Sequence, residues 1–390
     1  MIYVGIDVAK DKHDCHFISN DGEILLDNLS IPNSIVGFDS LKNTIYSFSN
    51  GNMNCVVVGL ESTGHYSTNL ISFLKHHNIP VIVLNALSVN RFRKSCTLRS
   101  TKTDKSDARY IAKVTMLSNP KPYLDISYHI LSLKSLTRCR YRLMKVIQPI
   151  KNRFRRALHI VFPEFENIFN LSLTSSYEII RKYPGPDAIL KARKSSLESF
   201  LSSISHGRLN HKTDALILAA KNSIGSNLYG DIFELQFICD EILFLENKLS
   251  QLECKIKDIM SQINSPITSI KGIGDIMGAT ILAEIGDIHN FSSPEKLQAY
   301  AGLAPQIYES GKYVGINTPM DKKGSVYLRN ALYQTTKAAY VTSTYMRSYI
   351  DRKRDQGKHF YTAISHGMRK MIRIIYAVLK KNSLFVEPAI

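Results

Sequence analysis

The chain has 390 residues, 44% of them hydrophobic, and a formal net charge of +17. This is enough apolar material for a full core divided over two or three domains, which excludes a small protein held together only by disulfides or metal. The six cysteines are scattered without a CxxC pair, so they favour neither a zinc ribbon nor a secreted disulfide framework. No run reaches the roughly 18 apolar residues of a membrane span, and no signal peptide is recognisable, so we expect a soluble cytoplasmic protein.

The positive charge is concentrated in two segments. Residues 88–159 carry 18 Lys or Arg against three acids, and residues 311–390 carry 15 against four. Such blocks are typical of surfaces that bind a phosphate backbone. Solvated helix faces give the same pattern, so charge alone leaves both interpretations open.

The first 85 residues alternate between strand and helix signals. A turn at Asn20-Asp21-Gly22 separates two of the strand-like runs. Strands are expected at 2–9, 16–19, 23–30, 54–61 and 80–85, and helices near 34–48 and 65–77. This hairpin-led α/β order is that of the ribonuclease H-like fold, although periodicity alone does not separate that fold from other α/β layers.

Four acids stand at chemically informative places in this basic chain. Asp7 ends the first strand and Glu61 ends the fourth, while Asp104 and Asp107 lie at i and i+3 of a helix expected over 103–118. Clustered carboxylates bind hard Mg²⁺ ions, and two such ions can promote in-line phosphoryl transfer. The alternative is that these acids cap turns and favour a helix N-terminus.

A strongly basic helix is expected over 134–156, with Pro149 predicted to kink it. Together with the basic residues that precede the Asp104–Asp107 pair, it predicts a nucleic-acid surface. The expected contacts are Arg91, Arg93, Lys94, Arg99, Arg138, Arg142, Arg153 and Arg156.

Residues 160–230 give mixed helical signals and no readable function. A heptad pattern then runs from Leu235 to Ile263 with both core positions apolar throughout, which predicts a coiled coil. We favour self-association through this helix, while a long helix in an intramolecular bundle would produce the same pattern.

The C-terminal region combines a glycine turn with a second set of basic residues. Gly272 and Gly274 resemble a helix-hairpin-helix turn, whose amides can hold a DNA phosphate, and close helix packing explains them equally well. A second nucleic-acid surface is expected at Lys312, Lys322, Lys323 and Arg329, and Tyr308 and Tyr313 could stack on bases.

Several motifs resemble a known family. GIDVAK, GLESTGHY and TKTDKSDARYIA are similar to the DEDD catalytic domain of the RuvC-like insertion-sequence transposases, the bridge-RNA-guided serine recombinases. KGIGDIMGATILAEIG, AYAGLAPQIYESGKYVG and KKGSVYLRNAL resemble the C-terminal transposase domain of that family. The resemblance implies a RuvC-like domain over 1–125, a helical and coiled-coil middle over 126–265, and a mostly α C-terminal domain over 266–390.

The same resemblance implies a chemistry. Asp7, Glu61, Asp104 and Asp107 would be ligands of Mg²⁺, and Ser310 would be a nucleophile that forms a phosphoserine ester with DNA. The partners would be donor and target DNA, a noncoding guide (bridge) RNA, and further copies of the chain as a dimer or a dimer of dimers. The serine and the acids are expected to meet from different subunits.

Other functions remain open at this level. A RuvC-like Mg²⁺-dependent junction-resolving nuclease would use the same four acids with water as the nucleophile. A non-catalytic nucleic-acid scaffold would use the basic surfaces alone. GIDVAK also suggests an actin-like ATPase, but the sequence lacks a second glycine-rich phosphate loop to complete it.

Overall fold

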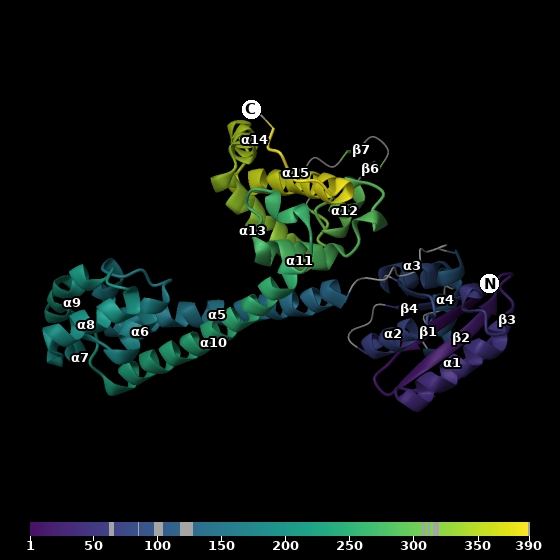
Figure 1. The fold of residues 1–390 in the computed structure, drawn as a ribbon, viewed down its shortest axis with the longest axis horizontal. Helices are drawn as coiled ribbons and strands as arrows, with labels where there is room; N and C mark the ends of the chain where they lie inside the picture. The colour runs from purple at the N-terminus through teal and green to yellow at the C-terminus, as the bar shows by residue number, and fades with distance from the viewer. Residues whose placement is uncertain are drawn as a thin grey trace. The chain divides into compact units, whose positions relative to one another are not determined.

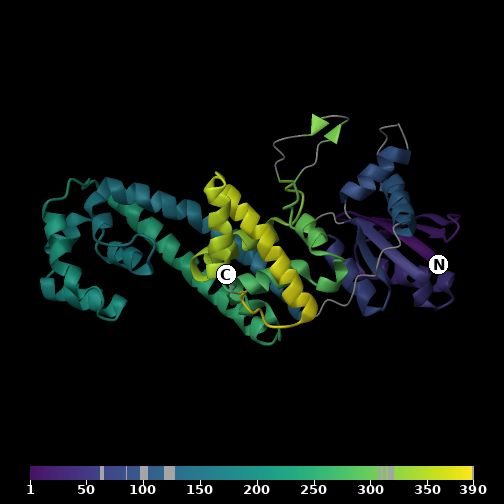
Figure 2. The same ribbon diagram turned by 90° about the horizontal axis from the view of Figure 1, so that it is seen from above.

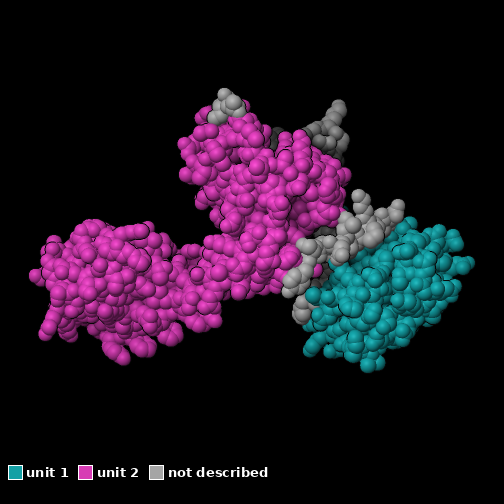
Figure 3. All heavy atoms as spheres, in the orientation of Figure 1, with its two compact units in different colours: residues 1–126 teal, residues 127–390 magenta. Residues whose placement is uncertain are grey.

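The computed structural model describes residues 1–61, 66–84, 86–96, 104–117, 128–305, 309–310, 313–314 and 320–388. Within these ranges the side chains at 86–88, 104–106, 128, 309–310 and 313–314 are not described. The chain divides into two compact units, residues 1–126 and 127–390 (Figure 3). Each unit has its own core, and each is described separately.

The first unit is built on a five-stranded mixed sheet with the order β3-β2-β1-β4-β5. The central strand β1 pairs antiparallel with β2 and parallel with β4, and β4 pairs parallel with β5. The strands are β1 (Ile2–Val8), β2 (Lys12–Ser19), β3 (Ile24–Pro32), β4 (Val56–Glu61) and β5 (Val81–Leu84). The predicted order of strands and helices is therefore confirmed, although β2 begins four residues earlier than the sequence signal.

Helices cover both faces of this sheet (Figure 1). Alternate residues of β1 (Val4, Ile6 and Val8) join the core on one face, where α1 (Ile35–Ser49) and α2 (Ser67–His76) pack. A smaller core, which Tyr3 lines, lies on the other face with α3 (Ala86–Cys96) and α4 (Asp104–Leu117). The period-two alternation of β1 thus separates an apolar face from the face that carries Gly5 and Asp7.

The second unit is organised around two long antiparallel helices, α5 (Tyr128–Val161) and α10 (Tyr229–Ser261) (Figures 1 and 2). Leu133 of α5 shares a core with Ile256 of α10, and Phe154 shares another core with Leu235, which fixes the antiparallel direction. Heptad residues of α10 are therefore packed within the chain. Pro149 lies inside α5 without ending it.

Each end of this helix pair supports a helical layer. The helices at one end, within the segment that gave mixed signals, are α6 (Thr174–Lys182), α7 (Pro186–Lys191), α8 (Lys194–Ser205) and α9 (Thr213–Lys221). At the other end lie α11 (Asp275–Ile285), α12 (Pro294–Tyr300), α13 (Val326–Thr342), α14 (Thr344–Asp355), α15 (Phe360–Lys381) and the two-residue strands β6 (Glu309–Ser310) and β7 (Tyr313–Val314). Short 3-10 turns occur at Met53–Cys55, Pro163–Asn167, Asn210–Lys212, Pro266–Ser269 and Ile288–Asn290.

The chain is thus a mixed α/β sheet unit followed by a mostly helical region, as the sequence predicted. Among the described helices, none has the length and apolar character that crossing a bilayer requires.

Candidate active site

Asp7 and Glu61 lie at the ends of two neighbouring parallel strands. The register pairs Gly5 with Gly59 and Ile6 with Leu60, so Asp7 and Glu61 are the next residues of the two strands. Because side chains alternate along a strand, both acids share a face with Gly5 and Gly59. Both are partly exposed. The sheet therefore presents these two carboxyl groups side by side on the face that α4 covers.

Two glycines determine how closely α4 approaches this face. A Cβ atom at Gly5 would lie 2.2 Å from the carbonyl oxygen of Ala108 and 2.3 Å from the amide nitrogen of Ala112. A Cβ atom at Gly59 would lie 1.8 Å from Oγ1 of Thr115. Any side chain at Gly5 would push the α4 backbone off the sheet, so this glycine is a requirement of close packing.

The approach of α4 brings its N-terminal half, which carries Asp104 and Asp107, to the same face. Asp107 is buried, with 8% of its surface exposed, and Oδ1 accepts a hydrogen bond of 3.1 Å from Nη1 of Arg93 on α3. Arg93 also donates to Oδ1 of Asn90 at 3.0 Å. Asp104 is the first residue of α4, and its side chain lies outside the described part of the chain.

The carboxylates are chemically suited to hard divalent cations, which prefer oxygen ligands. Among the described residues, however, no group of three or more His, Cys, Asp or Glu is close enough together to hold a metal ion. The side chain of Asp104, the fourth predicted ligand, is not among these residues. The structure thus places Asp7, Glu61 and Asp107 on one sheet face, and it leaves the complete four-acid set a prediction.

Asp14 was not predicted as a site residue, yet it lies on this face too. In the antiparallel register it is directly opposite Asp7, and only 4% of its surface is exposed. Oδ2 lies 3.1 Å from Nζ of Lys12, while Oδ1 is buried and has no hydrogen-bond partner among the described residues. The signal in the sequence was an acid within KHDCHF, a run that otherwise reads as a buried strand.

Ser310, the predicted nucleophile, lies in the β6–β7 hairpin, where it pairs with Tyr313. The side chains of Ser310 and Tyr313, and all of Tyr308 and Lys312, lie outside the described residues. What the structure does describe is the base of the segment that carries the hairpin. There Pro305 and Met320 form an isolated antiparallel bridge.

Arg329, predicted to bind nucleic acid, holds the base of this segment. Its Nη1 donates to the carbonyl oxygens of Ala301 at 3.2 Å and Lys322 at 3.4 Å. Gly324 packs so closely here that a Cβ atom would lie 2.1 Å from the carbonyl oxygen of Tyr300. Arg329 therefore has a structural task that the sequence did not reveal.

A buried ion pair connects the basic helix α5 to the base of the segment that carries the β6–β7 hairpin. Glu284 of α11 has a fully buried side chain and accepts from Nε of Arg138 at 2.6 Å and from Nη2 at 3.0 Å. Its Oε2 also accepts from Oγ of Ser325 at 2.8 Å, and Ser325 caps α13. Hydrogen bonding to Glu284 raises the pKa of Arg138, and burial lowers the pKa of the neighbouring Lys134.

The remaining predicted nucleic-acid contacts fall into separate groups. On α3, Arg91 and Lys94 are exposed, and Arg99 lies outside the described residues. On α5, Arg142 and Arg156 are exposed and have no ion-pair partner in the described part of the chain, whereas Arg153 lies 3.9 Å from Glu241. Near the serine hairpin, Lys322 is exposed and Lys323 lies 3.4 Å from Asp321.

The two predicted phosphate-binding glycines differ in their surroundings. Gly272 has a φ of +90°, and a Cβ atom there would lie 2.5 Å from the amide nitrogen of Ala339. Close packing on α13 is therefore sufficient to explain Gly272. Gly274 precedes α11 and has open space where a Cβ would be, so its role stays a prediction.

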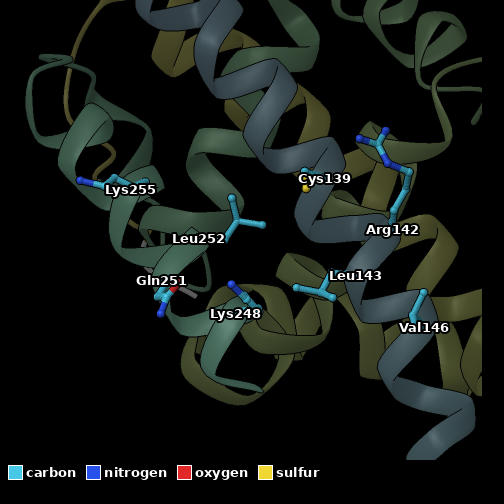
Figure 4. Close-up of a pocket in the computed structure, with 8 residues that line it drawn as sticks. All are labelled: Cys139, Arg142, Leu143, Val146, Lys248, Gln251, Leu252 and Lys255. Carbon is cyan, nitrogen blue, oxygen red and sulfur yellow. The ribbon is translucent and has the colours of Figure 1, made fainter. Parts of the chain in front are cut away.

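A groove lies between α5 and α10 near the middle of the pair (Figure 4). Leu143, Val146 and Leu252 supply apolar surface, and Val146 is 51% exposed. The other lining residues are Cys139, Arg142, Lys248, Gln251 and Lys255. The groove thus combines an uncovered apolar strip with positive charge.

Comparisons with known proteins agree with this arrangement of sequence and structure. A DEDD family model of the IS110 group, described as "Transposase", matches residues 4–163, and a second, "Transposase IS116/IS110/IS902 family", matches residues 264–351. The chain is similar to the "Insertion element IS116 uncharacterized 44.8 kDa protein" of Streptomyces clavuligerus, with 26% identity over 98% of this chain and 96% of the relative.

Two further relatives extend over nearly the whole length. The "Pilin gene-inverting protein" of Moraxella lacunata is 24% identical over 98% of this chain and 97% of its own. The "Insertion element IS900 uncharacterized 42 kDa protein" of Mycobacterium paratuberculosis is 24% identical over the same shares. The chain therefore carries, in order, the DEDD domain and the C-terminal domain of the IS110/IS116 transposase family, whose activity implies cleavage and transfer of DNA strands.

Proposed function

We propose that the chain is an RNA-guided DNA recombinase of an insertion sequence, which cleaves and rejoins donor and target DNA with a DEDD metal cluster and a serine nucleophile. The observation that carries the proposal is that the predicted acids gather on one face of the N-terminal sheet. Asp7 and Glu61 end adjacent parallel strands on it, and α4, which begins with Asp104 and carries Asp107, packs against it. A strand order of 3-2-1-4-5 with this placement of acids supports a ribonuclease H-like, RuvC-like domain.

The four acids would hold Mg²⁺, which when bound supplies charge stabilisation to a phosphodiester that is being cleaved. Asp7 and Glu61 fit this task because they are partly exposed at the end of the sheet. Arg93 would hold Asp107 in place through its 3.1 Å hydrogen bond.

Ser310 would attack a DNA phosphorus atom through its hydroxyl oxygen. A bond forms between this oxygen and phosphorus, a phosphodiester P–O bond breaks, and the deoxyribose oxygen leaves as a hydroxyl that takes up the proton lost from the serine. The phosphoserine ester keeps the energy of the broken bond, so a hydroxyl of another strand can reverse the step. The anchored base formed by Arg329 and Glu284 would hold the hairpin for this reaction.

Exposed basic residues would bind the nucleic acids. Arg142 and Arg156 on α5 and Arg91 and Lys94 on α3 are available for the guide RNA or the DNA backbone. Sequence choice would then reside in RNA–DNA pairing. RNA that copurifies with the protein expressed together with its flanking DNA would support this, whereas preparations free of specific RNA would contradict it.

A second copy of the chain would cover the groove between α5 and α10. Val146 and Leu252 line the groove, and Leu249, which continues the heptad pattern of α10, is only partly buried. We expect Val146→Lys to shift the sedimentation coefficient towards that of a smaller species. An unchanged coefficient for a protein that is otherwise an oligomer would contradict this interface.

The central experiment follows the covalent intermediate. A suicide DNA substrate that carries both ends of the element should form a protein–DNA adduct that survives denaturation. Ser310→Ala should abolish the adduct and retain DNA binding, and Asp7→Asn should abolish it as well. Cleavage by Ser310→Ala at the normal rate would instead identify a nuclease that uses water, and an adduct formed by Asp7→Asn at the normal rate would contradict the metal cluster.

A further inference from the structure

The antiparallel partner of Asp7 is another acid, Asp14. Residues directly opposite each other in such a pair lie about 4.5–5.5 Å apart at Cα, and their side chains point to the same face. Like charges in this position repel each other. The hairpin therefore places a second carboxyl group next to the first predicted metal ligand, on the face covered by α4.

The surroundings of Asp14 do not satisfy its charge. The residue is 4% exposed, and its Oδ1 is fully buried with no hydrogen-bond partner in the described part of the chain. Oδ2 contacts Nζ of Lys12 at 3.1 Å, but 54% of the Lys12 side chain is exposed, and such exposed ammonium groups contribute little. A buried carboxyl oxygen without a donor destabilises a fold, so its presence calls for a partner beyond the groups that the structure describes.

We propose that Asp14 is a fifth carboxylate of the metal site, and that its unpartnered Oδ1 accepts hydrogen bonds from the hydration shell of the cation bound beside Asp7. This inference rests on the proposed function. Mg²⁺ keeps several of its waters when proteins bind it, so carboxylates beyond its direct ligands contribute to its affinity. Such a role needs no direct ligation by Asp14.

The inference predicts opposite effects on stability and on metal binding. Asp14→Asn removes one of two facing charges at nearly constant volume, so the metal-free protein should melt at the same temperature or higher. The affinity for a divalent cation should fall by roughly 10-fold, as it does for lost outer partners of metal sites. A merely structural Asp14 would give the reverse, with a lower melting temperature and unchanged affinity.

The test is a calorimetric titration of the metal-free full chain with Mn²⁺, together with melting curves with and without Mn²⁺. Asp11→Asn is the matched control, because Asp11 is an exposed acid of the same hairpin. We expect this control to bind Mn²⁺ like the wild type, and Asp14→Asn to bind about 10-fold more weakly with a smaller Mn²⁺-induced rise in melting temperature. If Asp14→Asn does not fold, Asp14→Thr offers a smaller uncharged side chain for the same position.

Comparison with Asp7→Asn separates this inference from the proposed function. If Asp7→Asn loses Mn²⁺ binding while Asp14→Asn binds like the wild type, the role of Asp14 is wrong and the metal cluster stands. If neither Asp7→Asn nor Asp14→Asn changes the affinity, or the wild type binds no Mn²⁺, the metal cluster itself is wrong and the inference about Asp14 is overturned with it.

Discussion

The pair formed by Arg138 and Glu284 allows a sharp test of how the basic helix divides its charges between folding and nucleic-acid binding. Sequence patterning groups Arg138 with Arg142 and Arg156. In the structure Arg138 is committed to a bidentate pair with a carboxylate whose side chain is 0% exposed. The guanidinium carbon of Arg138 also lies 4.7 Å from the ring centroid of Tyr327, which adds a cation–π contact.

Arg138 and Glu284 are buried to different extents, so removing one or the other should cost different amounts of folding free energy. Arg138→Met would leave the fully buried Glu284 carboxylate without its guanidinium, and breaking such a pair costs about 3–5 kcal/mol. Glu284→Gln would leave a guanidinium that is 36% exposed and can reach water, so the cost is that of lost charge-assisted hydrogen bonds, about 1.5–3 kcal/mol. The double variant should cost less than the sum, because no unpaired buried charge remains.

Scanning calorimetry of the full chain and a nucleic-acid binding assay form the measurement. For a unit of this size, Arg138→Met should lower the melting temperature by roughly 6 °C or more, and Glu284→Gln should lower it by about half as much. At a temperature where all variants are folded, Arg138→Met should bind DNA like the wild type. Arg142→Ala, the exposed control on the same helix, should keep its melting temperature and bind more weakly.

The opposite pattern would refute this reasoning. If Arg138→Met costs less than about 1 kcal/mol and weakens DNA binding as much as Arg142→Ala, the ion pair does not hold the fold and Arg138 belongs to the binding surface.

Three further outcomes are expected. Gly5→Ala should destabilise the first unit by about 1–3 kcal/mol, seen as a lower melting temperature, and should reduce DNA cleavage, because the added Cβ pushes α4 away from the sheet. The control Gly230→Ala, where a Cβ meets nothing within 4 Å, should change neither. Hydrogen bonds from Lys271 and Ser343 lower the pKa of Glu387 from 4.5 to about 2, so ionised Glu387 should stabilise the fold fully above pH 4.5 and lose this effect as the pH falls towards 2. The difference in melting temperature between wild type and Glu387→Gln should shrink over that pH range, and a difference that does not change with pH would contradict this. Arg156→Ala should weaken DNA or RNA binding to all sequences alike and reduce the slope of log affinity against log salt by about 1, and an unchanged slope would argue against a phosphate contact.

Local patterns were sufficient for much of the fold. Strict alternation in IYVGIDV and apolar runs such as CVVVGLE specify strands because the period of side chains along a strand is two, whatever the neighbours are. The long basic helix and the heptad helix follow from their 3.6-residue and heptad periods in the same way. The acids at the strand ends could be found because Asp7 and Glu61 directly follow these runs.

The partners of these residues depend on contacts between segments far apart in the chain. Asp14 faces Asp7, and Arg138 pairs with Glu284 across 146 positions, which no local period encodes. The heptad pattern of α10 fits a partner from the same chain or from another copy, and only packing shows that α5 covers much of it. The sequence by itself determined which residues along each element are apolar and which carry charge. The tertiary structure decided which charges are neutralised inside the protein and which remain for a ligand, because burial and pairing arise only when the elements pack.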